Sequence, residues 1–177
     1  GNNMSITNNI QNPDKFYIYG SSVYTNYGYY NLWSADNTVT GGYNVGNDNP
    51  VVKTVYDPSP VGFKMPANNA FTGFTANGQN LGPRNVDGTD NLQTFQNNFG
   101  YNFWTSSSKT ATINFPASGV RASSDGSLDY VGTYGYYWSA VPNYSFDGCS
   151  LHFYSDGVYP LVYHSRSYGF AARPVAE

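Results

Sequence analysis

The chain has 177 residues, a formal net charge of −3 and only 11% charged residues, whereas 18% of its residues are aromatic. This length suits one domain with an ordinary hydrophobic core, and 19 Gly and 10 Pro are typical of a secreted protein rich in turns and strands. The sequence has no run of Lys or Arg and no apolar run near the roughly 18 residues of a membrane span, which excludes nucleic-acid binding and direct membrane insertion.

Residues 1–30 predict an N-terminal connecting segment or hairpin that precedes a domain over residues 31–177. Residues 1–12 are polar and rich in Asn, and aromatic residues then alternate on either side of Gly20. Such alternation favours two short strands or a hairpin. The first residue, Gly1, resembles a protease-tag remnant, so we expect the natural protein to be longer at this end.

The segment VVKTVYDPSPVGFKMP, residues 51–66, resembles the opening K-T-V-Y-D-P-C-P-P-G-W-R-V-P of a C-type-lectin-like domain found in many surface proteins of gut bacteria, often at fimbrial tips. Ser59 stands where that family has Cys, and Pro174 stands where its closing V-R-C-V has the second Cys. Because disulfide partners are lost together, the resemblance implies that Ser59 and Pro174 lie close in space. It covers residues 31–175 and implies an α+β, C-type-lectin-like fold of twisted antiparallel sheets with about two short helices.

The middle of the chain predicts two short helices. Phe71 and Phe74 lie three residues apart within residues 66–75, as the buried positions of a helix do. Residues 91–103 predict a second helix that Gly100 interrupts. The other predicted elements here are loops at residues 31–49 and 76–90, a strand at residues 111–120 and a turn at residues 121–132 that contains Asp125-Gly126.

Three strands are predicted near the C-terminus, at residues 136–140, 150–154 and 169–173. Within the second, alternation places Leu151 and Phe153 on one face and Ser150, His152 and Tyr154 on the other. The first face belongs to the core, so the second is available for binding. The residues assigned to the core in this region are Trp138, Leu151, Phe153, Phe170 and Val175.

The last 34 residues contain no Asn, although residues 1–143 contain 22, a rate that predicts about five. Both His and the only Cys of the chain lie there instead. The substituting residue types, such as Tyr, Ser, His and Asp, can be reached from an Asn codon by replacing its adenines. Together with the closing GFAARPV, the pattern resembles the variable region, here about residues 129–175, of target proteins of diversity-generating retroelements. The competing interpretation is that Asn is rare because it packs poorly on strands.

The resemblance implies a ligand-binding domain, a receptor or adhesin on a bacterial cell surface, a pilus tip or a phage particle. Its surface is rich in Tyr with small polar residues between, as antibody paratopes are. The expected partner is an unknown protein or glycan, and other pilus or surface subunits could attach through a missing N-terminal region. The predicted ligand-binding residues are Tyr134, Tyr136, Tyr144, Phe146, Asp147, His152, Tyr154, Asp156, Tyr159, Val162, Tyr163, His164, Ser165 and Tyr168.

Catalytic and metal sites are not favoured by the sequence. His152 and His164 could join Asp147 or Asp156, and Cys149 could act as a nucleophile, but the spacing matches no metal-ligand signature and fixes no carboxylate beside either His. The calcium motifs of sugar-binding C-type lectins are missing. Two alternatives stay open: a non-diversified structural fimbrial tip subunit, and a formylglycine-generating-type enzyme, although that chemistry needs two active-site Cys. We expect no enzyme, no metal and no cofactor.

Overall fold

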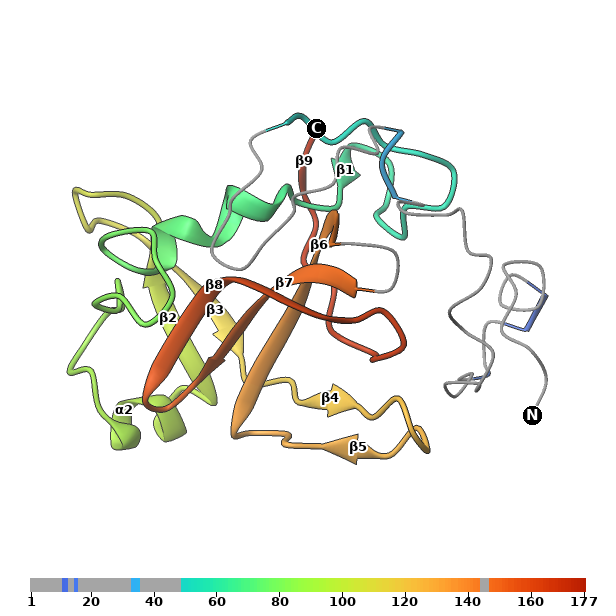
Figure 1. The fold of residues 1–177 in the computed structure, drawn as a ribbon. Coiled ribbons are helices and arrows are strands. Elements are labelled where there is room, and N and C mark those ends of the chain that lie inside the picture. The colour runs from blue at the N-terminus through green and yellow to red at the C-terminus, as the bar shows by residue number, and fades with distance from the viewer. Residues whose placement is uncertain (1–10, 13–14, 16–32, 36–48, 144–146) are drawn as a thin grey trace.

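A computed structural model of the chain describes residues 11–12, 15, 33–35, 49–143 and 147–177. Within residues 49–177 the fold combines antiparallel strands with two short helices and belongs to the α+β class, as predicted (Figure 1). The hairpin predicted before residue 31 and most of the loop predicted at residues 31–49 lie outside the described residues. The division into an N-terminal segment and one domain stays a prediction.

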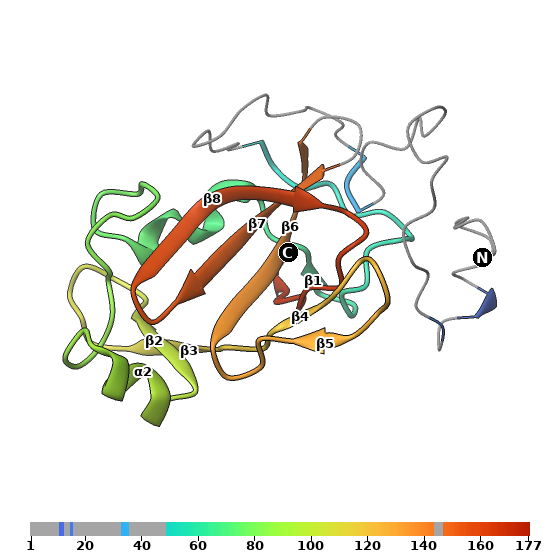
Figure 2. The ribbon, with the colours of Figure 1, turned by 60° about the horizontal axis from the view of Figure 1, so that its bottom comes forward.

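The central element is a three-stranded antiparallel sheet in the order β6-β7-β8, and Figure 2 shows its strands side by side. Its strands are β6 (Tyr134–Asn143), β7 (Asp147–Tyr154) and β8 (Gly157–Ser165). Strand β8 was not predicted, because Pro160 and an irregularity in the pairing with β7 interrupt its alternation. The predicted strand at residues 169–173 is wrong: Gly169 and Ala171 form only isolated bridges.

One face of this sheet builds the main core. Leu151, Phe153 and Val158 are fully buried there against an aromatic hairpin and a helix. These partners are β2 (Gly100–Trp104), β3 (Thr112–Pro116) and α2 (Leu92–Asn97). The Phe153 ring meets Phe103 of β2 at 5.8 Å and Phe95 of α2 at 6.3 Å between ring centroids. The core assignment of Leu151 and Phe153 is therefore confirmed.

Both predicted helices form, with corrections. The first is a 3₁₀ helix, η1 (Asn68–Phe74), which buries Phe71 as expected. The second, α2, begins where the Asn91 side chain accepts a hydrogen bond from the Thr94 N–H at 2.9 Å. It ends early, because Phe99 takes a φ of +52° and Gly100 starts strand β2. The helical prediction for residues 100–103 is wrong, because the pairing of β2 with β3 overrides a local pattern that suits either structure.

The predicted strand at residues 111–120 is confirmed in β3, and the turn that follows joins two short strands. These are β4 (Val120–Arg121) and β5 (Leu128–Asp129). The Asp125 carboxylate accepts a hydrogen bond from the Ser127 N–H at 2.9 Å, and Gly126 takes a φ of +76°, which suits Gly. The hairpin lies beside β6, where the Gly119 N–H donates to the Tyr134 carbonyl at 2.8 Å (Figure 2).

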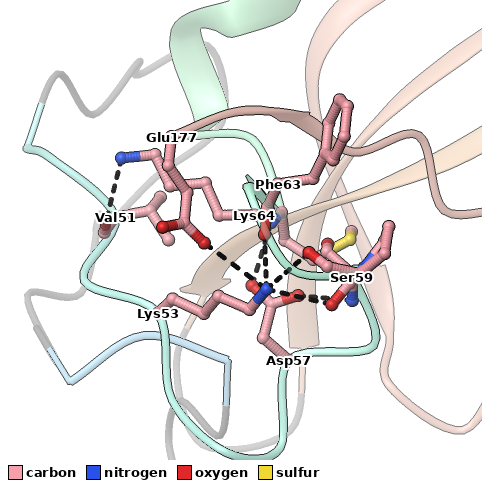
Figure 3. A network of polar contacts seen from close by, with 9 residues as sticks. Val51, Lys53, Asp57, Ser59, Phe63, Lys64 and Glu177 are labelled. Atoms are coloured by element: carbon pink, nitrogen blue, oxygen red, sulfur yellow. Dashed lines mark hydrogen bonds and ion pairs between the residues drawn. The ribbon is translucent and has the colours of Figure 1, made fainter.

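The two ends of the described domain meet in an antiparallel pair, β1 (Phe63–Lys64) with β9 (Val175–Ala176). The Lys53 ammonium group lies over this junction (Figure 3). It donates to the Ser59 carbonyl at 3.0 Å and the Pro60 carbonyl at 2.8 Å, and pairs with the Glu177 carboxylate at 3.4 Å. The segments that carry Ser59 and Pro174 therefore lie together, while their Cα separation stays a prediction. Val175 is exposed on this short strand, so its assignment to the core is wrong.

Candidate functional site

The second face of the β6-β7-β8 sheet carries a row of aromatic rings stacked across the strands. Tyr136 and His152 are register partners, with ring centroids 4.5 Å apart and an interplanar angle of 7°. His152 in turn stacks on its partner Tyr159 at 5.4 Å and 15°. Tyr134 stacks on Tyr136 at 6.1 Å, and Tyr154 lies 5.8 Å from His152. Cross-strand neighbours on one face come this close because side chains of paired strands alternate in step.

The loop after β8 extends this row by folding back over β6. Phe170 stacks on Tyr136 at 4.7 Å and on Trp138 at 4.3 Å, and Tyr168 stacks on Phe170 at 5.8 Å. The His164 ring meets Phe170 edge-on at 5.1 Å. We call this continuous, half-buried set the aromatic face; it consists of Tyr134, Tyr136, His152, Tyr154, Tyr159, His164, Tyr168 and Phe170.

Burial shifts the pKa of three members of the aromatic face, His152, His164 and Tyr136, toward their neutral forms. Burial lowers the pKa of His164 to about 4, and burial together with the nearby His164 lowers the pKa of His152 to about 4. Burial also raises the pKa of Tyr136 to about 12, helped by neighbouring Tyr134. The polar groups of this surface are therefore neutral hydroxyls and imidazoles.

Hydrogen bonding within the aromatic face is partial. The Tyr154 and Tyr159 hydroxyls lie 3.2 Å apart, and the His164 Nδ1 lies 2.9 Å from the hydroxyl of buried Ser150. The His152 Nε2 is buried and has no hydrogen-bond partner among the described residues. A neutral imidazole tolerates this position better than a charged one, because an unpaired buried charge costs far more.

Seven of the predicted ligand-binding residues belong to the aromatic face. They are Tyr134, Tyr136, His152, Tyr154, Tyr159, His164 and Tyr168. Val162, the register partner of Ser150, lies on the same side of the sheet but is buried, so its predicted exposure is wrong. It does not itself face solvent.

Four other predicted residues lie elsewhere. Tyr163 and Ser165 pair with Cys149 and Asp147, whose side chains alternate to the opposite side of the sheet. Asp147 is buried, which raises the pKa of its carboxyl, so its predicted exposure is also wrong. Asp156 is exposed in the turn between β7 and β8. Tyr144 and Phe146, the two remaining predictions, lie outside the described residues.

Two aromatic residues of this site were assigned to the core from sequence. Trp138 is buried as predicted, but in a second small cluster with Met65 on the side of the aromatic face. Phe170 is half-buried and joins the ring contacts directly. The sequence could have placed Trp138 on the side of the aromatic face, because Trp138 continues the alternation of Tyr134 and Tyr136 along β6. No comparable signal identifies Phe170, which lies on a loop.

Other kinds of site find little support in the part of the chain that the structure describes. There, no group of three or more His, Cys, Asp or Glu side chains could hold a metal ion. Cys149 is buried. None of the helices described is long and apolar enough to span a bilayer.

Residues 83–175, more than half of the chain, match the model of a protein family described as a domain of unknown function, DUF8237. The chain belongs to the DUF8237 family. The DUF8237 match begins before α2, contains β2 to β8 and ends at the first residue of β9, so it includes the whole aromatic face. Comparison with curated proteins and with solved structures gave no match.

Proposed function

We propose that the chain is a ligand-binding domain displayed on a bacterial cell surface, a pilus tip or a phage, with a C-terminal surface diversified by adenine-directed mutagenesis. The observation that carries the proposal is that many of the predicted ligand-binding residues lie on one face of the sheet. The predicted ligand-binding residues are spread over more than thirty positions, and seven of them belong to one aromatic face, five of these from the segment without Asn. Exposed and half-exposed aromatic clusters of this kind are common in interaction sites.

The alternation of fully buried and half-buried residues along β7 supports diversification. Leu151 and Phe153 are fully buried and ordinary in composition, whereas His152 and Tyr154 alternate with them on the other face. Random replacement is tolerated only where packing does not constrain the side chain. A strand with one fixed and one variable face meets this requirement.

We further propose that the domain has a C-type-lectin-like fold. The antiparallel pairing of β1 with β9 supports it, because the resemblance requires the opening and closing motifs to meet. Lys53, from the opening motif, bonds to that junction where the family has a disulfide. Placement of Ser59 and Pro174 more than about 10 Å apart in an experimental structure would contradict this fold, because disulfide Cα atoms lie about 5.5 Å apart.

The genome of the source organism offers a direct test of diversification. We expect a reverse transcriptase gene nearby and an Asn-rich near-copy of the last 130 or so bases of the gene. Differences between the two copies should fall at adenines of the near-copy. Absence of both elements would favour the alternative of a non-diversified structural tip subunit.

Ligand binding is tested by presenting the immobilised chain to a phage-displayed random-peptide library and to an array of neutral glycans. We expect binders that are lost in the Tyr136→Ala and Tyr159→Ala variants, since both rings lie in the middle of the aromatic face. Asn77→Ala, a change of an exposed residue in a turn outside the sheet, is the control and should bind as the wild type does. Binders that ignore both Tyr variants would contradict the proposed site.

A further inference from the structure

The β4–β5 hairpin exposes large apolar side chains close to the aromatic face. Leu128 is 58% exposed, Tyr130 57% and Val131 58%, all within four consecutive residues. None of the three belongs to the ligand-binding residues predicted from sequence. Contiguous exposed apolar residues are uncommon on a soluble surface and mark interaction sites.

Tyr130 connects this hairpin with the aromatic face. Its ring meets Tyr134 edge-on, with centroids 4.9 Å apart and an interplanar angle of 61°. The Tyr130 carbonyl accepts hydrogen bonds from the N–H groups of Thr133 and Tyr134, each at 3.0 Å, which fixes the turn into β6. Figure 2 shows the hairpin next to the beginning of β6. Tyr130 therefore joins the hairpin to the stacked rings.

The arrangement of the rings indicates what this surface can bind. The rings of Tyr134, Tyr136 and Tyr159 lie within 18° of parallel to His152, with centroids 4.5 Å to 5.6 Å from it, so they form one block of neighbouring rings. The hairpin adds Leu128 and Val131, two exposed aliphatic side chains that offer no hydrogen-bonding group to a glycan. The rings offer their edges and neutral hydroxyls, next to the exposed apolar side chains of the hairpin. The apolar side chains and rings suit the centre of a protein interface, and the charged Arg121 and Asp129 beside Leu128 suit its polar margin.

We propose that the binding surface continues from the aromatic face on to the β4–β5 hairpin, with Tyr130 as an exposed anchor, and that its partner is a protein with an apolar patch. The inference rests on the proposed function, because it extends the same site. It adds a specificity-determining residue and selects protein over glycan as the class of ligand.

Peptides enriched on the wild-type chain from the phage-displayed library serve as the probe, with affinity measured by calorimetry. Tyr130→Gly should weaken binding about tenfold or more, as loss of an anchor does. Its melting temperature should not fall much, because Tyr130 has a φ of +60° and Gly adopts that conformation without strain. The matched control is Phe99→Gly, since Phe99 is also an exposed aromatic residue with a positive φ but lies far along the chain, before β2. This control should bind peptide as the wild type does.

Three outcomes would overturn the inference and separate it from the proposed function. If Tyr130→Gly binds normally while Tyr136→Ala does not, the hairpin is not part of the site and the proposed function stands. If the chain binds neutral glycans and no peptide, the partner class is wrong and the proposed function again stands. If neither library yields a binder, both proposals fail.

Discussion

The two faces of the β6-β7-β8 sheet are both aromatic, but their rings are buried to different extents. On the core face, rings from α2 and the β2–β3 hairpin meet Phe153 at angles of 52° to 77° and leave it fully buried. On the aromatic face, the rings of Tyr134, Tyr136 and Tyr159 lie within 18° of parallel to His152, and all four are half-buried. The core face is closed by other elements of the chain, whereas the rings of the other face are stacked mainly on each other. A change on the core face should therefore cost stability, and one on the aromatic face should mainly cost binding.

The largest expected effect is on the core face. Phe153→Ala should lower the free energy of unfolding by about 3–5 kcal/mol, because it removes a fully buried ring and leaves a cavity. The neighbouring change Tyr154→Ala should cost only about 1 kcal/mol, because its half-buried ring mainly contacts other rings of the surface. Urea denaturation followed by fluorescence measures both. Equal losses of unfolding free energy in the two variants would contradict the expected difference between the two faces.

Acid should destabilise the protein through the aromatic face. His152 and His164 have a pKa of about 4 in the folded chain and about 6.5 when unfolded, so as the pH falls from 6.5 to 4 the unfolded state binds protons that the folded state does not. The two histidines should not change the free energy of unfolding above pH 7. At pH 5 each should have lowered it by about 2 kcal/mol relative to pH 7. Below pH 4 this contribution is constant.

The variant His152→Phe isolates the histidine contribution, because it keeps a ring in the stack but cannot be protonated. The loss of unfolding free energy between pH 7 and pH 5 should then be about half of the wild-type loss. An unchanged loss would show that other groups dominate the acid response.

Replacing two glycines with Ala tests how well each face of the sheet tolerates one added methyl group. In Gly135→Ala the new methyl would overlap the Phe153 ring on the core face, and we expect a loss of about 1–3 kcal/mol. In Gly148→Ala it would lie 3.1 Å from the edge of the Trp138 ring on the other side of the sheet, where a small shift relieves the contact. Thermal denaturation of the two variants should rank Gly135→Ala clearly below Gly148→Ala. The reverse order would mean that the aromatic face is the more rigidly packed.

The smallest effect is expected for Tyr163→Ala. Tyr163 is 39% exposed and alternates to the side of the sheet opposite His164. We expect a change in stability below about 0.5 kcal/mol and no change in ligand binding. Tyr154→Ala, measured with the same peptide probe, should weaken binding. Loss of binding in both variants would show that the site is not confined to one side of the sheet.

Local patterns in the sequence determined several features of this protein. The alternation along residues 150–154 assigned Leu151 and Phe153 to one face and His152 and Tyr154 to the other, and both assignments are confirmed. The turn at Asp125-Gly126 and the helix containing Phe71 were also predictable. Each depends on the conformational preferences of a few consecutive residues, which the sequence states directly.

Other features were decided only by tertiary structure. Strand β8 carries Pro160 and an irregular register, so it is recognisable as a strand only once β7 and the Asn80 side chain bond to it. The identity of the covered face likewise depends on the β2–β3 hairpin, and the position of Phe170 depends on how a loop folds back over β6. Alternation separates two faces of a strand, but which face is buried is set by segments far away in the chain, because burial is a property of the packed whole.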